Sequence, residues 1–185
     1  EEVADSRWFT GSGIYRDVTL EISDPRGFRA EGVFVTTEAV AKDGTATLRV
    51  RYETEGASAA ELILADAQGK QVACATAQGA VGEAELQVTA PKLWGPEHPE
   101  LYTLTAHALC GQTVVDEVTI PVGIRTLRFD ADHGFFLNGE SVKLRGVCVH
   151  HDAGALGAAV PKAVWRRRLQ KFKEMGCNAL RTAHN

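Results

Sequence analysis

The sequence predicts a mainly β chain, in which an immunoglobulin-like β-sandwich is followed by the start of a parallel β/α unit. Residues 45–54 alternate between apolar and polar side chains, and the same period of two recurs at 83–88 and 101–108. Further runs of strand-forming residues, separated by turn residues such as Asp43 and Gly44, bring the total to about seven short strands. Seven strands at this spacing are typical of an antiparallel sandwich of the immunoglobulin type.

After residue 142 the pattern changes from hairpins to strand, helix, strand. Apolar residues from Val164 to Met175 recur at helical spacing, Pro161 suits the first turn of the helix and Gly176 ends it. Strands at 142–149 and 177–180 flank this helix, so they are expected to be parallel. A parallel pair needs more strands and helices to cover both faces, and we therefore expect these strands to be short of partners.

Length and charge exclude several classes of function. The 185 residues carry a net charge of -4 with both signs interspersed, whereas nucleic acids and anionic membranes require a concentrated basic face. No apolar run has the length of a membrane span, and the first residues lack signal-peptide character. We expect a soluble protein that binds a small, weakly charged ligand; cytoplasm, periplasm and secretion all stay open.

The four cysteines indicate no metal or redox motif. Cys74, Cys110, Cys148 and Cys177 form no C-x-x-C pair. Trp94 lies between the first two and weakly resembles the tryptophan beside an immunoglobulin disulfide, but the spacings do not fit. Buried free thiols are the expectation.

The N-terminal segment suggests the end of a preceding domain. A glycine-rich turn at 11–13 leads into an expected strand at 18–22 that has no earlier partner in the chain. The turn is no dinucleotide fingerprint, because no strand precedes it and it opens a strand instead of a helix.

Polar side chains follow both strands of the predicted parallel pair. They are His150, His151 and Asp152 after the first strand, and Arg181, His184 and Asn185 after the second. The carboxyl ends of parallel strands share one edge of the sheet, which is where active sites are built in β/α barrels. A metal site is disfavoured because adjacent histidines on extended backbone point apart. A solvated loop stays an alternative, but two matching clusters favour a substrate pocket.

Four motifs, in order along the chain, give a specific resemblance. They are "SRWFTGSGIYRDV", "LWGPEHPELYTL", "GIRTLRFD" with "GFFLNGESVKLRGVCVHHD", and "MGCNALRTAHN". Together they resemble glycoside hydrolase family 2, the family of β-galactosidases, β-glucuronidases and β-mannosidases. The stretch "VCVHHDAGALGAA" is most similar to the β-galactosidase branch.

The resemblance implies a domain layout and a chemistry. Residues 1–24 would end a jelly-roll sugar-binding domain, 25–123 form the immunoglobulin-like sandwich, and 124–185 form a truncated βαβ start of a (β/α)8 barrel. Family members are retaining hydrolases with two catalytic glutamates about 5 Å apart. Both glutamates belong to later barrel strands, so no catalytic residue is expected here and the fragment alone is expected to be inactive.

The implied activity is hydrolysis of terminal β-galactosides, with a β-galactoside-containing oligosaccharide as partner. A β-glucuronidase or β-mannosidase is the alternative within the family, and a non-catalytic sandwich module for binding or spacing is the alternative outside it. The resemblance implies no organic cofactor and leaves a divalent or monovalent cation, and homo-oligomer formation, open.

Individual residues carry over from the family motifs. His150, Asp152 and His184 match residues that contact the sugar, and Arg181 matches the arginine that braces the carboxylate of the nucleophile. His151 stands where the family usually has an acidic residue, which makes the detailed contacts a separate question. The remaining candidates are His151 itself, Asn185, and Asp5 and Arg7 from the preceding domain.

Two other features have a structural interpretation. Arg166, Arg167 and Arg168 are expected to form a solvated face of the helix. Trp94 and Tyr102 are expected to be core or rim residues of the sandwich.

Overall fold

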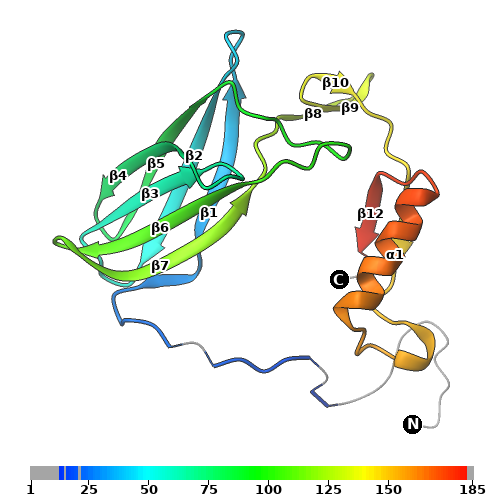
Figure 1. Ribbon diagram of the computed structural model, residues 1–185, viewed down its shortest axis with the longest axis horizontal. Coiled ribbons are helices and arrows are strands. Elements are labelled where there is room, and N and C mark those ends of the chain that lie inside the picture. Colours follow the sequence, from blue (N-terminus) through cyan, green and yellow to red (C-terminus); the bar gives the residue numbers. More distant parts are fainter. Residues whose placement is uncertain (1–12, 15, 21, 183–185) are drawn as a thin grey trace. The chain divides into compact units, whose positions relative to one another are not determined.

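The computed structural model describes residues 13–14, 16–20 and 22–182 of the chain, which are coloured along the sequence in Figure 1. The chain separates into two compact units. One is Glu21–Val142, and the other combines Glu1–Leu20 with Lys143–Asn185.

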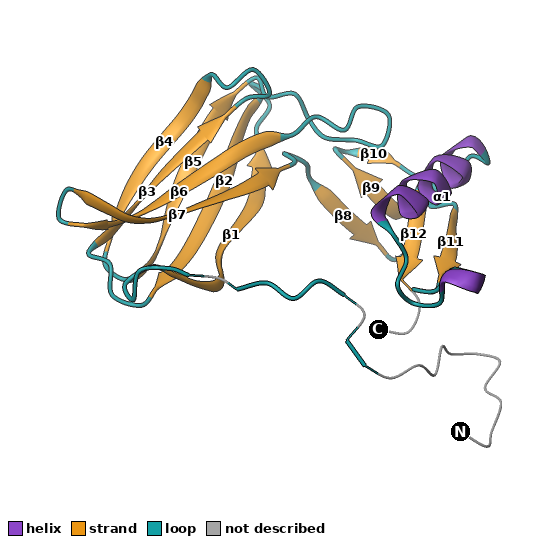
Figure 2. Cartoon of the chain, turned by 60° about the horizontal axis from the view of Figure 1, so that its bottom comes forward, coloured by secondary structure: helices purple, strands orange, loops and turns teal. Residues whose placement is uncertain are grey.

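The larger unit contains the predicted antiparallel sandwich (Figures 1 and 2). Its strands are β1 (Phe28–Val40), β2 (Thr45–Thr54), β3 (Ala59–Ala65), β4 (Gln71–Gln78), β5 (Val81–Thr89), β6 (Tyr102–Cys110) and β7 (Thr113–Val122). They form a three-stranded sheet in the order β1-β2-β5 and a four-stranded sheet in the order β4-β3-β6-β7. All pairs are antiparallel, so the sequence prediction of an immunoglobulin-like sandwich is confirmed.

The core lies between the two sheets and follows the period of two in the sequence. On β2, Leu48 and Val50 are fully buried, and Leu62 on β3 and Leu104 on β6 face them with no exposed area. The remaining core residues are Ala46, Tyr52, Ala60, Leu64, Leu86, Val88, Tyr102, Ala106, Val122 and Ile124. Alternation predicts the buried face correctly because each of these strands has one dry and one wet side.

Tyr102 and Trp94 pack against the loops that flank β6 and β7. The hydroxyl oxygen of Tyr102, at the start of β6, accepts a hydrogen bond from the backbone N–H of Lys92 at 2.9 Å, the arrangement known as a tyrosine corner. Trp94 packs on Gly123, where an added Cβ would lie 3.0 Å from the indole, and the guanidinium of Arg125 stacks 4.6 Å from its ring centre. Both aromatic residues are therefore structural, as the sequence predicted.

A small antiparallel sheet follows the sandwich. It consists of β8 (Leu127–Asp130), β9 (Gly134–Leu137) and β10 (Glu140–Ser141). The turn between β9 and β10 places Asn138 and Gly139 at φ of 53° and 82°, a conformation that these two residue types tolerate. The Asn138 side chain accepts from the N–H of Thr126 and donates to the carbonyl of Trp94, both at 3.0 Å, so it fixes this sheet to the loop before β6.

The smaller unit contains the predicted βαβ arrangement. Its elements are β11 (Gly146–Val149), the short 3-10 helix η1 (Gly154–Leu156), α1 (Lys162–Glu174) and β12 (Ala179–Thr182). β11 and β12 pair in parallel, which confirms the prediction, and α1 lies along this pair in Figure 2. Pro161 directly precedes α1 and Gly176, at φ of 84°, follows it, one residue from the expected positions at most.

One expected strand does not form. Residues 18–20 and 22 have no strand structure, and the apolar side chains that suggested one, including Val18 and Leu20, are 79% and 87% exposed. Alternation indicates a strand only where a neighbouring strand takes up its hydrogen bonds, and this segment has no such neighbour among the described residues.

The expectation that the cysteines are buried is wrong. All four are free thiols, but Cys74 and Cys148 are exposed and the other two only half-buried. Cys74 faces outward on β4 because its register partner, Ile63, lies on the outer side of β3.

In the described part of the chain, no helix is long and apolar enough to cross a membrane.

Candidate functional site

The parallel strand pair that carries the candidate site is aligned by Asn178. Its side-chain oxygen accepts a hydrogen bond from the N–H of Arg145 at 2.8 Å, and its amide nitrogen donates to the carbonyl of Lys143 at 3.0 Å. Gly146 permits this close approach, because an added Cβ would lie 2.7 Å from the carbonyl oxygen of Ala179. Sequence reasoning missed Asn178; an isolated amide residue just before an apolar strand was its only signal.

The register places the polar cluster at one edge of the pair. Val149 is opposite Thr182 in the last described rung, so His150 leaves the sheet directly after it. His150, His151 and Asp152 are half-buried, whereas Arg181 on β12 is exposed and lies opposite Cys148. The predictions for His184, Asn185, Asp5 and Arg7 concern positions outside the described residues.

A hollow of about 690 Å³ lies beside His151 in the same unit. It is lined by Arg16, Asp17, His151, Lys162 and Trp165, together with residues 158–161. Two basic side chains, one carboxylate and one indole make this lining suitable for a polar ligand with an apolar face. The Nδ1 atom of His151 is buried and has no hydrogen-bond partner within the described ranges. A buried imidazole nitrogen of this kind favours a ligand that can supply a donor or an acceptor.

The loop that carries the cluster folds on itself and is fixed to α1. The N–H of Ala153 donates to the carbonyl of Gly157 at 3.0 Å, and Gly154 and Gly157 both take φ of 55°. Arg168 donates from Nη1 to the carbonyl oxygen of Asp152 at 2.7 Å. The expectation that residues 166–168 form a solvated face is therefore wrong for Arg168, while Arg166 and Arg167 are exposed.

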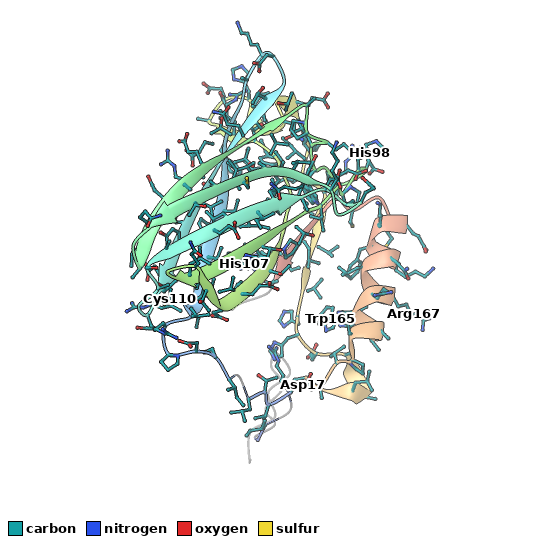
Figure 3. The ribbon with its side chains drawn as sticks, turned by 60° about the vertical axis from the view of Figure 1, so that its left-hand side comes forward. Asp17, His98, His107, Cys110, Trp165 and Arg167 are labelled. Carbon is teal, nitrogen blue, oxygen red and sulfur yellow. The ribbon has the colours of Figure 1, made fainter. Side chains whose placement is uncertain are left out.

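Figure 3 shows that side chains of α1 point to different sides of the helix. Trp165 and Arg167 point to opposite sides of the helix, and Trp165 is the one that lines the hollow. Within the described ranges, no three His, Cys, Asp or Glu side chains come together as a metal site would require.

Comparison with known families agrees with this architecture. The model of glycosyl hydrolases family 2 matches residues 28–125, and the model of the TIM barrel domain of the same family matches residues 130–185. The chain belongs to glycosyl hydrolase family 2. The sandwich and the parallel pair are thus its immunoglobulin-like domain and the start of its barrel.

Family 2 relatives with high similarity carry two kinds of name. The β-galactosidase BoGH2A of Bacteroides ovatus is 40% identical and aligns with 100% of this chain and 23% of its own length. A β-glucuronidase of Bacteroides fragilis is 34% identical, over 93% of this chain and 27% of its own length. A solved family 2 structure from Bacteroides cellulosilyticus is 37% identical with a TM-score of 0.88, covering 97% of this chain and 25% of that one. The chain spans about a quarter of these relatives.

Proposed function

We propose that this chain is the middle part of a retaining exo-β-glycosidase that hydrolyses terminal β-galactosides. The observation that carries the proposal is the parallel pair β11–β12 in a family 2 chain, with His150, His151 and Asp152 following one strand and Arg181 near the end of the other. Barrel active sites are built at this edge of the sheet, so these residues would form one wall of the sugar pocket.

The chemistry of the cluster suits a polyol ring. A neutral imidazole can donate to or accept from a hydroxyl group, and the Asp152 carboxylate can accept from two adjacent hydroxyls. His151, whose side chain lines the neighbouring hollow, adds a further polar group to this wall. In this proposal His150, Asp152 and His184 bind the substrate, and none of them moves a proton.

Catalysis in this proposal depends on two glutamates from later barrel strands. One protonates the leaving oxygen and later activates water, while the other forms the covalent glycosyl intermediate. Arg181 would hold the carboxylate of the nucleophile in place through charge-assisted hydrogen bonds. The 185-residue chain by itself is expected to be inactive.

A β-glucuronidase is the second candidate. Relatives of this chain carry that name, and Arg16 and Lys162 line the hollow next to His151, where they could attract a sugar carboxylate. A β-galactoside offers no charge to these two cations, so the two candidates differ in their salt dependence as well as in the sugar.

A panel of nitrophenyl β-glycosides tests the proposal. The polypeptide that carries this chain with a complete barrel is assayed on the β-galactoside, β-glucuronide and β-mannoside, and the 185-residue chain serves as the negative control. Preferential turnover of the galactoside supports the proposal, and preferential turnover of the glucuronide supports the second candidate. If the complete polypeptide turns over no glycoside, a non-catalytic sandwich module becomes the better interpretation.

The Asp152→Asn variant tests the site. We expect kcat/KM on the preferred glycoside to fall about 10- to 100-fold, because a neutral amide replaces the charged acceptor and one of its two acceptor oxygens becomes a donor. Asp132→Asn, an exposed carboxylate in the turn between β8 and β9, is the matched control and should leave kcat/KM unchanged. A D152N enzyme as active as the wild type would remove Asp152 from the site.

A further inference from the structure

Arg168 differs from the two arginines that precede it in α1. Arg166 and Arg167 are exposed, whereas Arg168 is half-buried and its Nη1 lies 2.7 Å from the carbonyl oxygen of Asp152, sixteen residues earlier. A hydrogen bond from a cationic donor at this distance is short and strong for its type. Arg168 therefore binds the backbone at the position that carries the proposed sugar-contacting carboxylate.

The loop needs such an anchor. Beyond Val149 the backbone leaves β11, so the Asp152 carbonyl has left the strand ladder. The hydrogen bonds Ala153 N–H to Gly157 O and Gly157 N–H to Gly154 O close the turn on itself. They set the shape of the turn but do not set its orientation on α1, whereas the bond from Arg168 joins the loop directly to the helix.

Trp165 restrains the guanidinium that makes this bond. The guanidinium carbon of Arg168 lies 5.1 Å from the centre of the Trp165 ring, within the range of a cation–π interaction. Trp165 also lines the hollow next to His151. One helix face thus holds the indole that lines the hollow and the cation that fixes the adjacent loop.

We propose that Arg168 is a positioning residue for substrate binding, which acts by fixing the backbone of Asp152 and so the direction of its carboxylate. The proposal rests on the function proposed above. Arg168 does not touch the sugar; it preorganises Asp152, which does. Loss of this preorganisation weakens the binding of the substrate and of the transition state to a similar extent.

The test uses the polypeptide with a complete barrel and three variants. Arg168→Met removes the donor but keeps the aliphatic length, Arg168→Lys keeps a cation, and Arg167→Met is the exposed control from the same helix. We expect R168M to lower kcat/KM on the preferred glycoside about 10-fold, chiefly through KM. R168K should recover part of this loss, and R167M should behave as wild type.

A double variant distinguishes positioning from general destabilisation. If Arg168 acts through Asp152, R168M added to D152N causes no further loss beyond about twofold, because the group that it positions is already impaired. Losses that multiply in the double variant, or an equal loss in R167M, would overturn the proposal. If R168M does not fold, R168K takes its place in the same cycle, with a smaller loss that should also disappear in D152N.

Hydrogen exchange separates this proposal from the proposed function. In the same variants, R168M should speed exchange of the Ala153 and Gly157 amides relative to R167M, whatever the substrate. If no glycoside is hydrolysed but these amides respond, the proposed function fails while the anchoring contact stands. If the amides of R168M exchange as in R167M, the positioning role is refuted even in an active enzyme.

Discussion

The sandwich and the parallel pair bury their apolar side chains to very different extents. In the sandwich, two sheets close on fourteen buried residues, among them Leu48 and Leu104 with no exposed area. In the other unit, α1 has no buried residue, and Leu169 and Met175 are 47% and 73% exposed. An antiparallel sandwich completes its own core, whereas a parallel pair depends on further layers. Stability is thus concentrated in one unit and the proposed chemistry in the other.

Hydrogen exchange on the 185-residue chain should show this contrast most strongly. We expect amides of β2 and β6 to exchange only on global unfolding, and amides of β11 and β12 to exchange on the order of a thousandfold faster through local opening. The reason is that β11 and β12 form a two-stranded sheet within the described part of the chain. Equal protection of the Val147 and Leu48 amides in a demonstrated monomer would contradict the comparison.

Two matched leucine substitutions come next in size. Leu48→Ala should lower the free energy of unfolding by about 2–5 kcal/mol, because it opens a cavity in a closed core. Leu169→Ala removes the same atoms from a half-exposed position on α1 and should cost less than about 1 kcal/mol in this chain. Urea denaturation followed by tryptophan fluorescence measures both; similar losses would mean that α1 is as tightly packed as the sandwich.

The smallest expected effect is a pH dependence confined to the sandwich. His107 on β6 lies between its register partners Glu61 and Glu117, with ring nitrogens 2.9 Å and 3.0 Å from the two carboxylates (His107 is labelled in Figure 3). The hydrogen bond to Glu61, followed by the bond and the charge of Glu117, raises the pKa of His107 above 6.5, although burial opposes the shift.

Because the pKa of His107 is higher in the folded state, its stabilising contribution is complete below about pH 6.5 and is lost as the pH rises through the folded value. Both carboxylates are about half exposed, so the effect should stay below about 1 kcal/mol. Urea titrations between pH 6 and 9 should show a decline that His107→Gln abolishes. A decline of the same size in H107Q would assign it to other groups.

The sequence predicted those elements that have a periodic cause. The sandwich strands were correct because residues such as Leu48 and Leu86 alternate with solvated ones, and α1 was correct because its apolar residues recur at helical spacing. The expected strand at 18–22 had the same alternation, but within the part of the chain that the structure describes no neighbouring strand pairs with it.

The contacts that shape the candidate site could not be predicted in this way. Arg168 bonds a carbonyl sixteen residues away and Asn178 one thirty-five residues away, and bonds from a side chain to a distant backbone group leave no repeat in the sequence. The roles of His150, Asp152 and Arg181 came from resemblance to family motifs and stay predictions. The parallel direction of the two strands, in contrast, followed from the strand, helix, strand order.

Asn178 fixes the register of the parallel pair β11–β12. Its side chain holds Arg145 through an acceptor and Lys143 through a donor, so a shift of β12 by one residue would lose both bonds together. Such a shift would also turn every side chain of β12 to the opposite face, Arg181 included. The direction of the side chains at the carboxyl edge therefore depends on contacts that Asn178 makes at the amino end of the same strands.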